Sequence, residues 1–214
     1  MNVWLDAALI SVIILGLFIV ASTRLATMIQ IFSVQSVILG CVPLLMYAKD
    51  LEFFIIIISL AAVVLRGFIM PNFLFWAIRH VSVRSEASPF IGLGTTLLLS
   101  GVSIVGSFLL ASRLVFPVAI SSDLVVPSSF SLIIMGFILI VGRTKAISQV
   151  IGYLLLENGI FLFAILLLKK MPLLVEMGIL LDLFIATVVM GIVVNNISEE
   201  FNNMDTVELS TLKD

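Results

Sequence analysis

Apolar residues in this chain form long continuous runs, separated by short polar segments. A helix of about 20 residues crosses the apolar layer of a bilayer, and several of the runs reach that length. None of the runs alternates between apolar and polar residues as a membrane-spanning strand does. The pattern therefore predicts an all-α, polytopic membrane protein with about seven transmembrane helices. We expect these helices at residues 3–21, 28–48, 53–78, 89–111, 127–142, 146–168 and 172–194, followed by a polar, acidic tail at 195–214.

The composition agrees with this pattern and excludes several kinds of site. Hydrophobic residues make up 62% of the chain and charged residues 11%, and the mean hydropathy of +1.32 is far above that of soluble proteins. A net charge of −2 gives no reason to expect binding to nucleic acid. The single cysteine, Cys41, lies within an apolar run, where we expect a small buried side chain. We expect no catalytic residue, cofactor or metal site in the chain, since it has no haem-attachment motif, nucleotide-binding glycine loop or histidine cluster.

Small and polar residues on two of the expected helices predict packing against protein. The helix at 28–48 begins with a polar face formed by Gln30, Ser33, Gln35 and Ser36. The helix at 89–111 is rich in glycine and serine, which is typical of a close approach between helices in lipid.

Two carboxylates lie near the middle of expected spans. Glu157 occupies this position in 146–168, and Asp182 occupies it in 172–194. A carboxylate at that depth costs roughly 2.5 kcal/mol or more on insertion scales, so it faces a water-filled cavity, a partner chain or a proton path. Glu176 is on the same helix as Asp182 but is rotated from it by about 120° and lies about 9 Å nearer the membrane surface.

Arg66 has two possible placements. The membrane span could end near Leu65, which would place Arg66 at the surface. The apolar run 53–65 covers only about 20 Å, however, which is too short to span a bilayer. We therefore favour a buried Arg66 that pairs with a carboxylate. Pro71 removes a backbone donor and predicts a kink beginning near Gly67.

These charged residues admit two interpretations. They could be a structural ion cluster, or they could be a row of titratable groups through which protons pass parallel to the membrane. Burial and neighbouring charges both change how readily a carboxylate ionises, so such a group can change its charge state when a neighbour moves.

Two stretches of the chain resemble known membrane subunits. The stretch Gln149-Val-Ile-Gly-Tyr-Leu-Leu-Leu-Glu-Asn-Gly-Ile-Phe-Leu-Phe163 resembles the second helix of the small K chain of respiratory complex I, which also carries a mid-membrane glutamate. With the stretch 174–191 and the tail included, nearly the whole chain resembles component E of hydrogenase-4, a membrane subunit of nickel–iron hydrogenase and formate hydrogenlyase complexes. The resemblance implies that Glu157 matches the first carboxylate of the K chain. It also implies that Asp182 matches the second, which is a glutamate in complex I.

The resemblance also implies an organisation and a function. Residues 1–126 would be an N-terminal membrane part, 127–194 a three-helix part like the K chain, and 195–214 a tail. The chain would be a membrane subunit of a hydrogenase or complex I-like assembly in the cell inner membrane, packed against antiporter-like subunits, with the redox chemistry on other chains. Glu157, Asp182, Arg66 and Glu176 would contribute to its proton path. The alternatives are a C-type small subunit of a multisubunit cation/proton antiporter, a free-standing transporter and a purely structural scaffold.

The basic residues between the expected helices predict an orientation. With seven helices, four Lys and Arg residues lie in connections on one side of the membrane, and six lie on the side of the C-terminus. Because basic residues accumulate in cytoplasmic segments, this count favours an outside N-terminus and a cytoplasmic C-terminus.

Overall fold

The computed structural model describes residues 3–47, 53–80, 92–114, 122–167 and 191, and its elements there are all helices. They are α1 (Val3–Ala21), α2 (Leu25–Met46), α3 (Phe53–Ala62), the π-helix η1 (Val63–Ile69), α4 (Met70–His80), α5 (Leu93–Ala111), α6 (Val125–Gly142) and α7 (Ala146–Leu167). Within these ranges six helical segments are long and apolar enough to cross a membrane, with α3, η1 and α4 forming one of them. The all-α, polytopic prediction is confirmed. The seventh expected helix and the tail lie outside the described residues.

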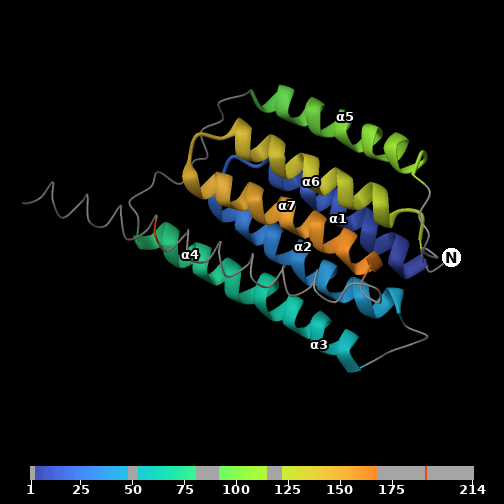
Figure 1. Cartoon of the computed structure of the whole chain (residues 1–214). Coiled ribbons are helices and arrows are strands. Elements are labelled where there is room, and N and C mark those ends of the chain that lie inside the picture. Colours follow the sequence, from blue (N-terminus) through green and yellow to red (C-terminus); the bar gives the residue numbers. More distant parts are fainter. Residues whose placement is uncertain (1–2, 48–52, 81–91, 115–121, 168–190, 192–214) are drawn as a thin grey trace, which may run out of the picture.

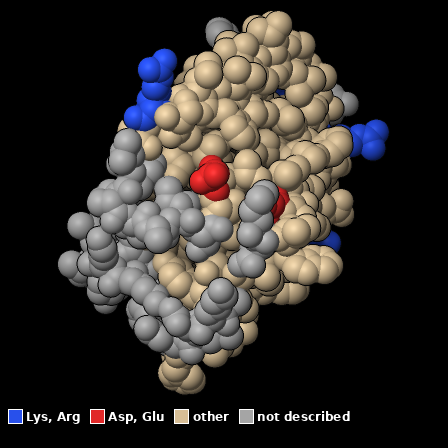
Figure 2. Space-filling view, turned by 90° about the vertical axis from the view of Figure 1, so that its right-hand side faces the viewer, with Lys and Arg blue, Asp and Glu red and all other residues tan. Residues whose placement is uncertain are grey.

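The helices lie side by side and run in alternating directions (Figure 1). The helices α1, α2, α6 and α7 occupy the middle of the bundle, with α5 on one outer side and the rod of α3, η1 and α4 on the other. Figure 2 views the bundle from the end at which α1 begins, and few of the described residues visible there carry a charge.

One hydrophobic core joins the first two helices to α6 and α7. Leu9, Phe32, Leu132 and Ile151, one from each of these four helices, are completely buried in it. The N-terminal part and the K-like part expected from the sequence therefore share a core in the described residues.

Glycines hold α6 and α7 unusually close together. A Cβ atom added to Gly136 would lie 2.6 Å from the backbone nitrogen of Leu156, and one added to Gly159 would lie 2.7 Å from the carbonyl oxygen of Ser129. At these positions no larger residue fits without separating the helices. Dispersion forces and close packing drive helix association in lipid, so this contact stabilises the pair.

Arg143, in the turn between α6 and α7, caps the C-terminus of α1. Its Nη2 donates hydrogen bonds of 2.9 Å to the carbonyl oxygens of Val20 and Ser22. Burial lowers the pKa of Arg143, although a guanidinium stays protonated in proteins. These two bonds fasten the α6–α7 hairpin to the last turn of α1 and to the residue that follows it.

Cys41 corrects one expectation, because the structure places it on the exposed surface of α2. Its neighbours Gly40 and Val42 are buried, and the helical period turns Cys41 outward. An apolar run in a membrane helix includes residues that face lipid, so apolar sequence surroundings did not imply burial.

In the described residues, the serines of α5 lie on its buried face as the small-residue pattern predicted, but its glycines do not. A Cβ atom at Gly94, Gly101 or Gly106 would meet nothing within 4 Å in the described structure. The buried face of α5 is instead formed by its hydroxyl residues, each of which donates to a carbonyl oxygen three or four residues earlier in the helix: Thr96, Ser100, Ser103 and Ser107. These internal hydrogen bonds satisfy the hydroxyls, so a polar face can pack without unpaired groups.

Candidate functional site

Arg66 is carried by the π-helix η1, which interrupts the long rod between α3 and α4. Pro71 lacks an N–H group and cannot donate to the carbonyl oxygen of Gly67 four residues earlier. The hydroxyl of Ser33 on α2 donates to that oxygen instead, at 2.6 Å. At the position where a kink was expected, the helix has a π-helical stretch that includes Gly67, a form that is frequent at functional sites.

Arg66 and Glu157 form a buried ion pair between η1 and α7. The Nη2 atom of Arg66 lies 2.7 Å from Oε1 of Glu157, and the two side chains are 6% and 3% exposed. Arg66 lies inside a continuous helical segment, Ile55–Arg79, that is long and apolar enough to cross a membrane, and its side chain is buried rather than at the surface. The prediction that Arg66 is buried beside a carboxylate is confirmed.

Phe161 completes the contact around the guanidinium. The Cζ atom of Arg66 lies 4.5 Å from the centroid of the Phe161 ring, which is within the range of a cation–π interaction. Residues four apart share one face of a helix, so Glu157 and Phe161 approach the same guanidinium from successive turns of α7. The sequence analysis missed Phe161, although an aromatic residue four positions after a mid-membrane acid is the signal that could have identified it.

Because both side chains are buried, each charge needs the other to be stable in the protein interior. A charge in a low-dielectric interior is stable only if a partner compensates it, and removing one partner of a buried pair destabilises a protein by about 3–5 kcal/mol. The geometry can therefore hold a carboxylate charged in the middle of the bundle. It also couples that charge to any movement that separates η1 from α7.

A second polar cluster lies beside the ion pair. The side-chain amide of Asn158 on α7 donates to Oε1 of Gln35 at 3.4 Å and to Oγ of Ser36 at 3.2 Å. Gln35 in turn donates to the carbonyl oxygen of Val12 on α1 at 2.8 Å. The predicted packing of the polar face of α2 on protein is confirmed at Ser33, Gln35 and Ser36, whereas Gln30 is exposed.

The other two residues of the predicted proton path, Asp182 and Glu176, lie outside the described residues. Their place in a row with Glu157 and Arg66 stays a prediction. Among the residues that the structure describes, His, Cys, Asp and Glu side chains do not gather in groups of three or more that could hold a metal ion.

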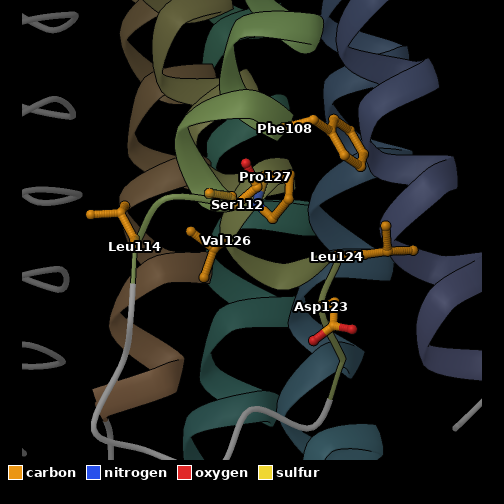
Figure 3. Close-up of a pocket in the computed structure, with 8 residues that line it drawn as sticks. Phe108, Ser112, Leu114, Asp123, Leu124, Val126 and Pro127 are labelled. Atoms are coloured by element: carbon orange, nitrogen blue, oxygen red, sulfur yellow. The ribbon is translucent and has the colours of Figure 1, made fainter.

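A pocket of about 320 Å³ lies elsewhere, between the end of α5 and the start of α6 (Figure 3). Its lining is mostly apolar, with one hydroxyl and one carboxylate: Phe108, Ala111, Ser112, Leu114, Asp123, Leu124, Val126 and Pro127. It contains no pairing of charged or nucleophilic groups in its lining comparable to Arg66 and Glu157, so we take the ion pair as the candidate site.

Comparisons with known proteins find distant relatives among curated proteins. The chain is 26% identical to an uncharacterized protein of Mycobacterium tuberculosis over 214 residues, which cover 100% of this chain and 97% of that protein. It is 24% identical to hydrogenase-4 component E of Escherichia coli over 159 residues, 74% of each chain. The same values hold for hydrogenase-4 component E of Shigella flexneri. No profile of a known protein family and no solved structure matches the chain.

Proposed function

We propose that this chain is an integral membrane subunit of a hydrogenase complex of the hydrogenase-4 type, and that Glu157 is part of a proton path within it. The similarity to hydrogenase-4 component E, which extends over 74% of the chain, supports the assignment to such a complex. In such a complex the partners of the chain are the other membrane subunits, among them antiporter-like chains. The complex lies in the cell inner membrane.

The observation that carries the proton path is the buried pair of Arg66 and Glu157. Glu157 lies near the middle of the candidate span Ile147–Leu166, and Arg66 lies near the middle of Ile55–Arg79. Charged residues at such a depth are rare, and those that exist mark ion and proton paths more often than lipid-facing positions. In the proposed mechanism Glu157 accepts a proton when its contact with Arg66 opens, and it releases the proton when the contact closes. Asp182 and Glu176 extend this path in the proposal, and the redox chemistry belongs to other chains.

Two substitutions of Glu157 test the proposal. Glu157→Asp keeps an ionisable group, and Glu157→Gln keeps the size and hydrogen bonding but cannot be charged. The complex is reconstituted in vesicles, turnover is started, and the redox rate and the pH change inside the vesicles are recorded together. We expect Glu157→Gln to lose at least about tenfold in proton movement per electron, the scale of removing a proton-transferring group, and Glu157→Asp to keep most of it.

The control for general damage is Phe137→Leu, because Phe137 is an exposed apolar residue on α6. It should leave both rates unchanged. If Glu157→Gln moves protons as the unmodified complex does, the ion pair is structural and the proposed path is wrong.

A further inference from the structure

Both members of the ion pair are linked to the same turn of α2. Gly67 follows Arg66 in the sequence, and its carbonyl oxygen accepts the hydrogen bond of Ser33 at 2.6 Å. Asn158 follows Glu157, and its amide donates to Gln35 and Ser36 at 3.4 and 3.2 Å. One turn of α2, residues 33–36, thus contacts the neighbour of each charged residue.

This turn is itself held in place. Gln35 and Ser36 are 0% and 1% exposed, and Asn158 is 1% exposed. Buried amides need hydrogen-bond partners, and Gln35 uses its second group to donate to Val12 of α1 at 2.8 Å. A rotation or shift of α2 would therefore break several buried hydrogen bonds at once.

Helix geometry explains why these contacts orient the charges. Successive residues of an α-helix point about 100° apart, so fixing the direction of Asn158 also fixes the direction in which Glu157 leaves α7. On the side of η1, the carbonyl oxygen of Gly67 lacks its usual helical donor because Pro71 has no N–H group. The hydroxyl of Ser33 donates to this oxygen, which belongs to the residue next to Arg66. The side chains of Asn, Gln and Ser do not ionise near neutral pH. They therefore act on a proton path only through the ion pair of Arg66 and Glu157.

We infer that Ser33, Gln35 and Ser36 of α2, together with Asn158 of α7, are positioning residues that hold Arg66 and Glu157 in contact. The first two helices thereby control the charged pair. The consequence of this positioning for proton movement rests on the proposed function.

The first test measures the energetic coupling between Arg66 and Glu157 without any transport assay. A double-mutant cycle with Arg66→Met and Glu157→Gln gives this coupling from the unfolding of the full-length chain in detergent. The cycle is repeated in a Gln35→Leu/Asn158→Leu background, in which both partners become apolar residues of similar size so that packing is retained. We expect the coupling to fall to roughly half or less in that background, since contacting residues share their interaction energy.

Two milder variants and two controls accompany the double-mutant cycle. Ser33→Ala and Ser36→Ala each remove one hydroxyl and should weaken the coupling by a smaller amount, while Ser33→Thr keeps the donor and should preserve it. Gln30→Leu changes an exposed polar residue on the same helix and should leave the coupling unchanged. An undiminished coupling in all of the buried variants, even with a lower melting temperature, would overturn the inference and leave the proposed function intact.

The second test adds proton movement in vesicles. The Gln35→Leu/Asn158→Leu complex should keep its redox rate but move fewer protons per electron. If the coupling falls as expected while Glu157→Gln still moves protons normally, the positioning role holds and the proposed function fails. If the coupling falls but Gln35→Leu/Asn158→Leu moves protons as the unmodified complex does while Glu157→Gln does not, the control of the path by α2 is wrong.

Discussion

At the scale of single residues, the guanidinium of Arg66 is the feature on which the site depends. It contacts the carboxylate of Glu157 and the ring of Phe161, both on α7. A buried cation among apolar helices needs compensation from the residues around it, and these two contacts supply it. The pair is therefore both a stabilising contact and a pair of charges whose separation has a large energetic effect.

Neutralising one member of the pair should be more harmful than neutralising both. Arg66→Met and Glu157→Gln, each made alone, should lower the free energy of unfolding by about 3–5 kcal/mol because each leaves a buried charge without its ion-pair partner. The double variant should recover most of this loss, since Met also packs well on an aromatic ring. Denaturant unfolding of the purified chain measures all three values.

The matched control is Arg79→Met, which removes an exposed arginine from the same rod and should change the stability little. Purely additive losses in the double variant would show that Arg66 and Glu157 do not interact in solution.

At the scale of elements, the contact between α6 and α7 sets the position of the site, because α7 carries Glu157, Asn158 and Phe161. Gly136 and Gly159 allow this contact, and a Cβ atom at either one would collide with backbone of the facing helix. In contrast, Gly101 on α5 has open space around its Cα atom in the described structure.

Alanine substitutions should distinguish these two kinds of glycine. Gly136→Ala and Gly159→Ala should each destabilise the chain by about 1–3 kcal/mol through overpacking. Gly101→Ala should be neutral or stabilising, by up to about 1 kcal/mol, because alanine favours a helix over glycine. Thermal unfolding of the three variants checks this. Equal effects at Gly101 and Gly136 would show that α6 and α7 are not packed as described.

The sequence predicted the elements well where an apolar run ends in clear polar residues. The expected helix 3–21 has the bounds of α1, and the expected helix at 146–168 begins at the first residue of α7. The pairing of Arg66 with a carboxylate also followed from the sequence, because 53–65 is too short to span a membrane. These predictions rest on length and on the cost of buried charge, both of which are local properties.

Other features depended on which side of a helix meets a neighbour, and the sequence did not determine this. Cys41 and the glycines of α5 lie in apolar, glycine-rich surroundings, but they face outward. The amide cluster of Gln35 and Asn158 joins residues 123 positions apart. The sequence shows both residues as polar positions within apolar helices. Their contact depends on how α2 and α7 pack, which the sequence does not show.

At the scale of the whole molecule, the bundle has a large apolar outer surface. The outer helix α5 exposes a row of large apolar side chains, among them Leu98, Val102, Val105 and Leu109. Lipid or other membrane subunits can cover such a surface, and the proposed function implies that subunits cover part of it.

Gentle solubilisation should therefore recover the chain in a complex. We expect it to co-purify with hydrogenase and antiporter-like membrane subunits, identified by mass spectrometry after affinity purification of a tagged chain. The double variant Arg66→Met/Glu157→Gln should stay in that complex, since it leaves no buried charge without its partner. A monodisperse chain that transports ions alone would contradict the proposal and support a free-standing transporter.

The most direct test of the ion pair as a proton path is the number of protons moved per electron by the double variant Arg66→Met/Glu157→Gln. This variant removes both charges together, so the fold is preserved while the titratable group is lost. In vesicles that contain the assembled complex, we predict a redox rate close to normal and a proton-to-electron ratio reduced at least about tenfold, the effect of losing a proton-transferring group. A double variant that assembles and moves protons at the normal ratio would contradict the account and make the pair a structural contact.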